Sequence, residues 1–261
     1  MSFLNQNGLS FSNASLNRGI TPFNTLYGDT SLTAYWKFNE ASGDIINQSQ
    51  SASDLGSGAD FQITGATYIP SGDTSPFGYA MLFDGVDDFG KAGTSLSQFS
   101  FLYSTTSTFT IAFWLKIVPQ AGERYVFDNS NNFAGSFIRI GDDESGGFAV
   151  KNSSSQTVIP GDVSANFFPD TNWHFYVWTN DQSLGSNNTK VKRDDANLEQ
   201  FTKTGNTPTN GNSGTALYVG ARNATSLPAN MYICEVSIWS KVLTDADQTS
   251  LYNAGAGLEI Y

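Results

Sequence analysis

The stretch Tyr79-Ala-Met-Leu-Phe-Asp-Gly-Val-Asp-Asp-Phe-Gly90 decides the fold, because it has the pattern of a strand, a tight acidic turn and a second strand. Successive side chains of a strand point to opposite faces, so Tyr79, Met81 and Phe83 are expected on one face. Asp84 and the glycine after it supply the turn, since Gly accepts a positive φ and Asp hydrogen-bonds nearby backbone amides. The rest of the chain reads as a sandwich built around this hairpin.

The composition supports an all-β protein. Of 261 residues, 14% are charged and 14% are aromatic, and much of the polarity comes from Ser, Thr and Asn. Such a composition favours many short strands joined by turns over long amphipathic helices. The net charge of −11 argues against nucleic acid or an anionic membrane surface as the partner.

The single cysteine, Cys234, excludes an internal disulfide framework and a multi-thiolate metal site. The N-terminus lacks the basic segment and apolar run of a signal peptide, and no window reaches membrane-spanning length. We therefore expect no membrane insertion.

Alternating apolar residues predict a series of strands. The clearest covers residues 108–118, where the odd-numbered residues from Phe109 to Ile117 are expected in the core and Trp114 on the other face. Residues 171–180 place Phe175 on one face, and Tyr176 with Trp178 on the other. Further strands are expected at residues 33–39, 61–68, 124–128, 136–140, 147–151, 189–193, 199–203, 216–220 and 230–239.

One short helix is predicted near the C-terminus, over residues 244–255. Thr244 can cap it with Asp247 near the N3 position, and Gly255 fits a C′ stop. Residues 1–30 carry scattered apolar residues and almost no charge, so we expect an extended N-terminal arm followed by one domain over residues 31–261. The arm is interpreted either as a poorly ordered terminus or as a segment that lies along a partner.

Six motifs, in this order, resemble the LamG-like jelly roll of the concanavalin A-like lectin/glucanase superfamily. They are Tyr35-Trp-Lys-Phe-Asn-Glu-Ala-Ser-Gly, Met81-Leu-Phe-Asp-Gly-Val-Asp-Asp, Phe109-Thr-Ile-Ala-Phe-Trp-Leu-Lys, Trp173-His-Phe, Leu217-Tyr-Val-Gly-Ala and Glu235-Val-Ser-Ile-Trp-Ser-Lys-Val-Leu-Thr. The resemblance covers about residues 31–256. It implies two curved antiparallel sheets forming a sandwich and a binding role rather than catalysis.

Many members of this superfamily hold a structural calcium with an Asp just before the Glu of the last long strand, where this chain has Cys234 and Glu235. Asn47 likewise stands where relatives often have an Asp. Calcium needs six to eight oxygen ligands, so the usual site is expected to be weakened or absent. Alternation groups Cys234 with Tyr232, Val236 and Ile238, and we interpret it as a small buried hydrophobe.

Two sets of residues are candidate sites. Asp84, Asp87 and Asp88 are either a calcium ligand set or turn residues in water. Trp114, Tyr176 and Trp178 offer aromatic planes for sugar rings, or else they pack under loops or against another subunit.

The sequence does not favour an enzyme. The alternating Glu-X-Asp-X-X-Glu pattern of glycosidases in this superfamily is missing, and so is a nucleophile-elbow motif. The sole histidine, His174, lies within an apolar strand and is expected to be structural.

The leading functional hypothesis is a non-enzymatic surface module of a virion, such as a phage decoration, tail or adhesion protein. Its location would be the virion surface, and residues 1–30 would bind other particle or capsid subunits. The alternative is a free-standing lectin, located outside the cell and recognising cell-surface glycans. A glycoside hydrolase is a remote third class. Calcium is the one cofactor considered, and self-association into a homo-oligomer is left open.

Overall fold

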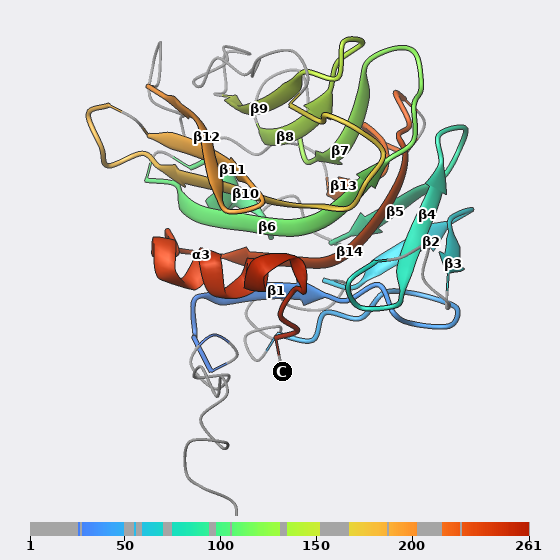
Figure 1. Ribbon diagram of the computed structural model, residues 1–261, viewed down its shortest axis with the longest axis horizontal. Helices are drawn as coiled ribbons and strands as arrows, with labels where there is room; N and C mark the ends of the chain where they lie inside the picture. The colour runs from blue at the N-terminus through green and yellow to red at the C-terminus, as the bar shows by residue number, and fades with distance from the viewer. Residues whose placement is uncertain are drawn as a thin grey trace, which may run out of the picture.

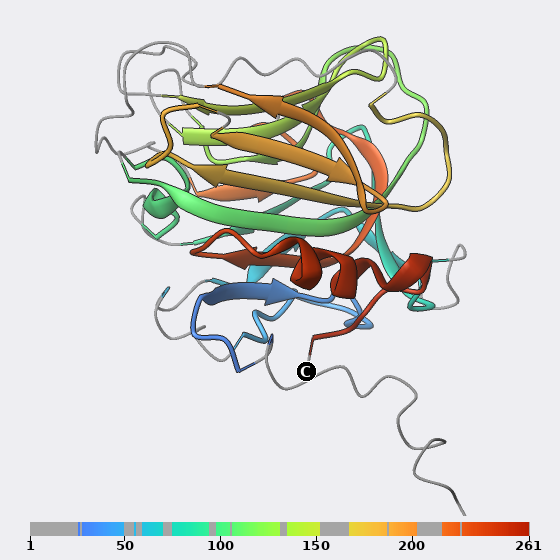
Figure 2. The same ribbon diagram turned by 60° about the vertical axis from the view of Figure 1, so that its left-hand side comes forward.

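The computed structural model describes residues 26, 28–49, 55, 59–69, 75–93, 98–104, 106–130, 135–151, 167–186, 188–202, 216–224 and 226–260. Within these residues two antiparallel sheets stack face to face as a sandwich, which Figures 1 and 2 show from two sides. The predicted jelly-roll architecture with one short C-terminal helix is confirmed.

The larger sheet has eight strands. They are β1 (Leu32–Trp36), β3 (Thr67–Ile69), β4 (Ala80–Asp84), β6 (Thr108–Ile117), β10 (His174–Asp181), β11 (Thr189–Arg193), β12 (Ala196–Phe201) and β14 (Asn230–Trp239). Their order is β12-β11-β10-β6-β14-β4-β3, and β1 also pairs with β14. The long strands β6 and β14 therefore form the centre of this sheet.

The smaller sheet has six strands in the order β2-β5-β13-β7-β8-β9. Their bounds are β2 (Phe61–Thr64), β5 (Phe89–Ala92), β7 (Arg124–Asp128), β8 (Gly135–Ile140), β9 (Gly146–Lys151) and β13 (Leu217–Val219). A 3-10 turn, η2 (Ser100–Leu102), precedes β6.

The main core lies between the two sheets. The odd-numbered residues of β6 from Phe109 to Ile117 all belong to it, as the sequence predicts. Met81 and Phe83 of β4 join them, together with Trp36 of β1. Because each fully buried large apolar side chain contributes roughly 1.5–3 kcal/mol, this layer supplies most of the stability.

A second apolar layer covers the outer face of the eight-stranded sheet. Helix α3 (Asp245–Tyr252) lies against this face beside β14, and the C-terminus ends near β1 (Figure 1). Leu251 of α3 and Ile260 of the C-terminal segment bury Trp114, Phe175 and Cys234 there. The central part of the eight-stranded sheet is thus buried on both faces.

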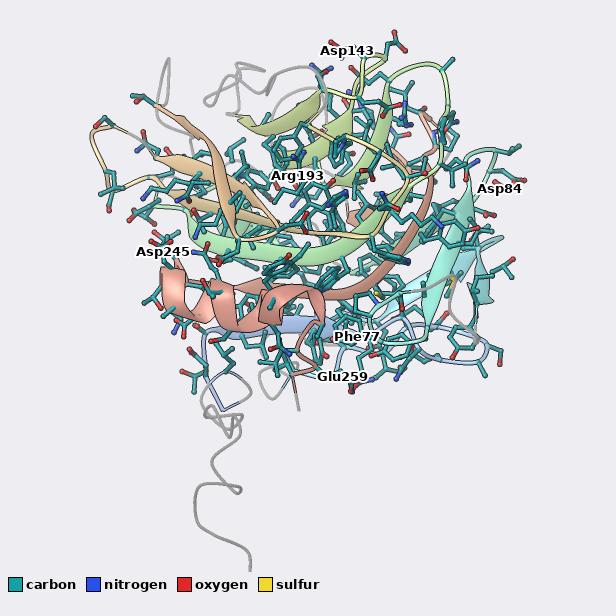
Figure 3. All side chains as sticks on the ribbon, in the orientation of Figure 1. Phe77, Asp84, Asp143, Arg193, Asp245 and Glu259 are labelled. Carbon is teal, nitrogen blue, oxygen red and sulfur yellow. The ribbon has the colours of Figure 1, made fainter. Side chains whose placement is uncertain are left out.

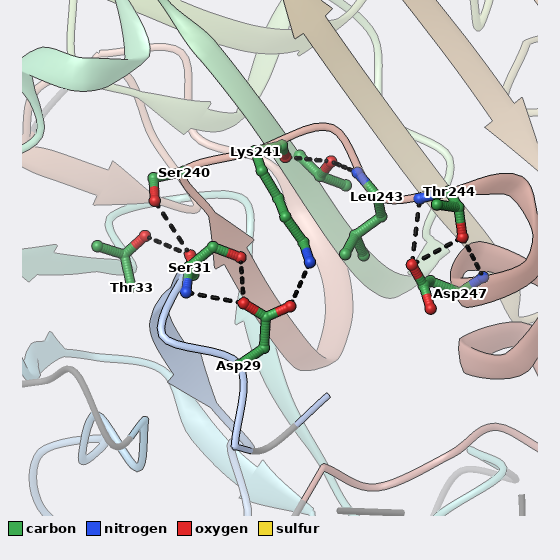
Figure 4. A network of polar contacts seen from close by, with 9 residues as sticks. Asp29, Ser31, Thr33, Ser240, Lys241, Leu243, Thr244 and Asp247 are labelled. Carbon is green, nitrogen blue, oxygen red and sulfur yellow. Dashed lines mark hydrogen bonds and ion pairs between the residues drawn. The ribbon is translucent and has the colours of Figure 1, made fainter. Parts of the chain in front are cut away.

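The helix start agrees with the prediction and the helix end does not. Thr244 and Asp247 form a reciprocal capping box, drawn in Figure 4. The helix stops at Asn253, which is in the left-handed conformation, and a 3-10 turn, η3 (Asn253–Gly255), follows. The predicted stop at Gly255 is wrong because Asn253 already ends the helix: Asn tolerates a positive φ, and the side-chain amide of Asn253 donates a hydrogen bond to the Gly257 carbonyl.

The strand expected over residues 61–68 is two strands in different sheets. Strand β2 pairs with β5 in the smaller sheet, whereas β3 pairs with β4 in the larger one. Gly65, with φ of +77°, turns the chain between them. A positive φ of this kind is available to Gly at little cost, so one apparent strand can cross from sheet to sheet.

Two expected side-chain orientations are wrong. Tyr79 lies just before β4 and packs on the outer layer, not with Met81 and Phe83. In β14 a bulge at Glu235, with φ of +52°, inserts one extra residue against β6. The bulge reverses the alternation, so Cys234 lies in the outer layer while Val236 and Ile238 face the core.

The segment before β1 is held to the domain. Leu26 is buried in the outer layer, and Asp29 forms an ion pair with Lys241 and accepts hydrogen bonds from Ser31 (Figure 4). The predicted arm otherwise falls on residues 1–25 and 27, which lie outside the described residues.

Candidate functional site

A cleft of about 400 Å³ opens at the corner of the sandwich where β2 turns into β3. Its walls are residues 41–44 on one side and the β2–β3 turn with Tyr68 on the other, and Met81 lies at its base. Because β3 is the edge strand of the eight-stranded sheet, the cleft lies at the mouth between the two sheets.

Backbone contacts hold the first wall in place. Gly43, at φ of +84°, turns the loop of residues 41–44. Directly after it, Ile45 exchanges two backbone hydrogen bonds with Phe61 of β2, both of 2.9 Å. The Glu40 carboxylate accepts from the Ile46 amide at 3.1 Å. The loop is therefore anchored to the smaller sheet at its C-terminal end.

The second wall depends on contact between Gly65 and Asp88. A Cβ at position 65 would lie 1.9 Å from Asp88 Oδ1, so only Gly fits there. The other Asp88 oxygen accepts a hydrogen bond of 2.8 Å from the Asp84 amide. Asp88 of the β4–β5 turn thus packs against the β2–β3 turn at Gly65, and the cleft adjoins the acidic cluster.

The cleft combines an aromatic ring with several oxygen atoms. Tyr68 is half-buried, whereas Ser42, Asp44 and Thr67 are exposed. An aromatic face beside a few polar groups suits a ligand that has both apolar faces and hydroxyl groups. Asp44 is the one carboxylate among the described residues that line the cleft, so the paired carboxylates of glycoside hydrolysis are not assembled there.

Sequence reasoning does not single out Tyr68. Its position depends on the break at Gly65, and a Gly inside an apparent strand is the one local signal of that break. An intact strand over residues 61–68 would have formed no corner and no cleft.

The three predicted calcium ligands are close together. One carboxylate oxygen from each of Asp84, Asp87 and Asp88 lies within 4.8 Å of the others. Asp84 also accepts from the Val86 amide at 2.8 Å, which is the turn contact expected for it. The pKa of Asp88 is raised, mainly by burial. The hydrogen bond from the Asp84 backbone amide lowers this pKa, and the negative charges of Asp84 and Asp87 raise it further.

The three predicted sugar-binding aromatics are not brought together, because they lie on different faces of the sheet. In the register of β6 and β10, Trp114 lies opposite Phe175, so Trp114 faces the outer layer. Tyr176 and Trp178 face the main core instead. Their exposed fractions are 3% for Trp114, 2% for Tyr176 and 0% for Trp178, because α3 and the second sheet cover the two faces.

The residues at the usual calcium position of the superfamily do not fit a metal site. Burial is the main cause that raises the pKa of Cys234, which is fully buried, so its thiol stays protonated. Glu235 accepts hydrogen bonds from the Tyr35 and Tyr79 hydroxyl groups. Asn47 uses its side-chain oxygen for two backbone amides, at 2.9 and 3.1 Å.

His174 is bound on both sides by carboxylates. Its Nε2 lies 3.1 Å from Asp170 and its Nδ1 contacts Asp194. Burial lowers the pKa of His174, but these two carboxylates outweigh it and the net direction is upward. With both ring nitrogens engaged, neither is placed to activate a nucleophile.

A smaller pocket of about 210 Å³ lies beside the start of α3. It is lined by Lys190, Lys192 and Asp245, with Lys192 and Asp245 joined by an ion pair of 2.8 Å. Figure 3 shows Asp245 and Asp84 on opposite sides of the molecule, so this pocket is remote from the cleft. No aromatic side chain is among the described residues that line it.

Residues 88–247 match the family described as the concanavalin A-like lectin/glucanases superfamily, which is more than half of the chain. The chain belongs to this superfamily. The comparison with curated proteins finds no match.

Several solved structures share this superfamily's fold. Domain 4 of AbnA, a GH43 extracellular arabinanase from Geobacillus stearothermophilus in complex with arabinotriose, is 18% identical, with 84% of this chain and 97% of that chain covered and a TM-score of 0.58. The binding domain of botulinum neurotoxin DC in complex with SialylT is 15% identical, with 86% of this chain and 51% of that chain covered and a TM-score of 0.57. The binding domain of Paraclostridial Mosquitocidal Protein 1 is 14% identical, with 86% of this chain and 52% of that chain covered and a TM-score of 0.61.

The chain spans about half the length of these toxin binding domains and nearly the whole of the arabinanase domain. At these identities the likeness concerns the fold alone. In the part of the chain that the structure describes, no helix is long and apolar enough to cross a bilayer.

Proposed function

We propose that this chain is a non-enzymatic carbohydrate-binding module and that its site is the corner cleft. The observation that carries the proposal is the placement of the half-buried Tyr68 ring beside the exposed oxygens of Ser42, Asp44 and Thr67. The ring offers an apolar plane to one face of a sugar, and the oxygens accept or donate hydrogen bonds to its hydroxyl groups.

Two of the similar structures support this class of ligand. One is an arabinanase domain in complex with arabinotriose, and the other is a toxin binding domain in complex with SialylT. They support a sugar as the class of ligand for this chain without specifying which sugar or where it binds.

Calcium at Asp84, Asp87 and Asp88 stays a prediction. Three carboxylates within 4.8 Å repel one another, and a divalent cation would relieve that repulsion. Because Asp88 packs against Gly65 of the β2–β3 turn, a cation bound at Asp88 would stiffen the wall of the cleft. Under this prediction, glycan binding weakens when a chelator is added.

The virion assignment also stays a prediction. None of the structures compared above is described as viral, so the assignment rests on the sequence features of the domain and of residues 1–30. The same holds for the virion surface as its location, for particle subunits as partners and for homo-oligomers. A carbohydrate-binding module is compatible with an adhesion role on a particle and with an extracellular lectin.

The experiment is a glycan array that includes arabino-oligosaccharides and sialylated glycans, run with calcium and again with a chelator. Calorimetric titration of the best ligand should then show a loss of about tenfold or more in affinity for Tyr68→Ala, and a loss for the exposed Asp44→Ala. The matched control is Tyr218→Ala, which removes a half-buried tyrosine from β13 on the other sheet.

Absence of binding under both array conditions would contradict the proposal. So would full affinity in a folded Tyr68→Ala protein. Thermal unfolding of each variant separates loss of the site from loss of the fold.

A further inference from the structure

A row of side chains that are not buried crosses the outer face of the eight-stranded sheet. Lys116 of β6 is paired with Tyr232 of β14, Tyr232 with Leu82 of β4, and Leu82 with Thr67 of β3. Directly paired residues of antiparallel strands share a face, so these four side chains lie side by side. Thr67 is exposed and the other three are partly exposed.

The row continues past Lys116 to a second aromatic ring. Trp173 immediately precedes β10 and alternates with Phe175, which belongs to the outer layer. Its ring centroid lies 6.4 Å from that of Tyr232, and the Lys116 ammonium lies 5.2 Å from the centre of the Tyr232 ring. Trp173 and Tyr232 therefore flank Lys116 at one end of the row.

The other end of the row reaches the cleft. Thr67 lines the cleft and stands on β3, the edge strand of the sheet. Three strand spacings of about 4.8 Å separate Thr67 from Lys116, which makes about 14 Å, and Trp173 lies beyond. This length exceeds a single sugar ring and is suited to a short oligosaccharide.

We propose that this row, which we name the outer-face row (Thr67, Leu82, Lys116, Trp173 and Tyr232), extends the cleft into a binding surface for a linear oligosaccharide. The inference rests on the proposed function and specifies its ligand as a chain rather than a single sugar. One sugar occupies the cleft at Tyr68, on the inner side of β3, and the following sugars pass around this edge strand at Thr67 and cross Leu82 toward the two aromatic rings. The Lys116 ammonium and the Thr67 hydroxyl supply hydrogen bonds to sugar hydroxyl groups.

The chemistry agrees with the layout of the row. Tyr and Trp offer an apolar body together with a polar tip, which matches the alternation of C–H faces and hydroxyl groups around a sugar ring. Leu82 adds an apolar contact between Thr67 and the Tyr232 ring. Each further sugar that lies on the row adds contacts to a ligand already oriented by the cleft, so affinity should rise with chain length.

The test uses two linear series, arabinose to arabinotetraose and glucose to cellotetraose, titrated into the full chain. For the series that binds, affinity should rise at least tenfold from the monosaccharide to the tetrasaccharide. Trp173→Ala and Tyr232→Ala should remove most of that gain and change monosaccharide affinity less than twofold. Tyr68→Ala should weaken all lengths, and Tyr218→Ala should weaken none.

A second measurement needs no variant. Of the five tryptophans, Trp36, Trp178 and Trp239 are 0% exposed and Trp114 is 3% exposed. Trp173 is therefore the accessible tryptophan for oxidation by N-bromosuccinimide in the folded chain. The tetrasaccharide should protect Trp173 from oxidation, and the monosaccharide should not.

Affinity independent of chain length, or tetrasaccharide binding that leaves Trp173 open to oxidation, would overturn the outer-face row while leaving the cleft in place. Binding that is lost in Tyr218→Ala and retained in Tyr68→Ala would instead contradict the proposed function itself. The two failures are thus distinguishable.

Discussion

The buried carboxyl group of Glu235 gives the sharpest prediction about stability. Glu235 occupies the bulge of β14, is 5% exposed, and accepts hydrogen bonds from Tyr35 and Tyr79. Burial is the main cause that raises its pKa from 4.5 to about 8; the tyrosine hydroxyl groups oppose this, and the charge of Glu259 adds to it. At neutral pH the folded protein therefore holds a proton on Glu235 that the unfolded chain has released.

The sign of the pH effect follows from that difference. The folded-state pKa lies above the unfolded value, so this contribution to stability is fully present below pH 4.5 and is lost as pH rises toward 8. At about 1.36 kcal/mol per pKa unit, the part of the loss that falls between pH 5 and pH 8 is about 3 kcal/mol. Gln has nearly the same shape and no charge, so Glu235→Gln should lack this loss.

The assay is urea unfolding followed by tryptophan fluorescence at pH 5, 6, 7 and 8. The free energy of unfolding of the wild type should fall by about 3 kcal/mol more than that of Glu235→Gln across this range. The matched control is Glu123→Gln, the same change in a half-exposed ion pair with Arg139, which should follow the wild type. Parallel pH profiles for wild type and Glu235→Gln would refute the reasoning.

Three further predictions concern single contacts. Gly65→Ala should lower the free energy of unfolding by about 2 kcal/mol or more, because the new Cβ would meet Asp88 and φ at this position is positive. The control Gly78→Ala also has a positive φ but open space around it, so it should lower the free energy of unfolding by about 1–2 kcal/mol. Chemical denaturation measures both changes. In the same assay, Thr244→Ala should lower the free energy of unfolding by about 1 kcal/mol, because it removes the capping box of α3. Cys234 should resist labelling by Ellman's reagent until the protein unfolds, because it is fully buried and its pKa is raised; rapid labelling of the native chain would contradict this.

Features that depend on a few neighbouring residues are predictable from this sequence. The strand β6 follows from strict alternation between Phe109 and Ile117, and the helix start follows from the spacing of Thr244 and Asp247. In both cases the signal lies within one strand or one helical turn. The order of motifs along the chain then suffices for the two-sheet architecture.

The prediction that Trp114, Tyr176 and Trp178 bind sugar failed for a different reason. Helix α3 covers the outer face of the sheet, so β6 and β10 carry large apolar residues on both faces. Alternation then no longer distinguishes the core from an exposed surface. Which aromatic rings are exposed depends on where the last residues of the chain fold back, and that information is not local.

Two backbone irregularities explain the errors in β14 and over residues 61–68. The bulge at Glu235 reverses the faces within β14, and Gly65 divides one apparent strand between two sheets. A bulge at a non-glycine residue leaves little signal in the sequence. Gly65 can be recognised in the sequence as a break in a strand pattern, but the sequence does not show that the chain crosses to the other sheet there. The cleft at Tyr68 arises from the second irregularity, so it is the least predictable part of the molecule.

The measurement that tests the central claim most directly is hydrogen–deuterium exchange of the full chain with and without a saturating glycan chosen from the array. The account predicts slower exchange in residues 41–44 and 63–68, which supply the two walls of the cleft. It predicts no change around Tyr218 on the opposite sheet. Protection confined to the six-stranded sheet or to the pocket beside α3, with the cleft unchanged, would contradict it.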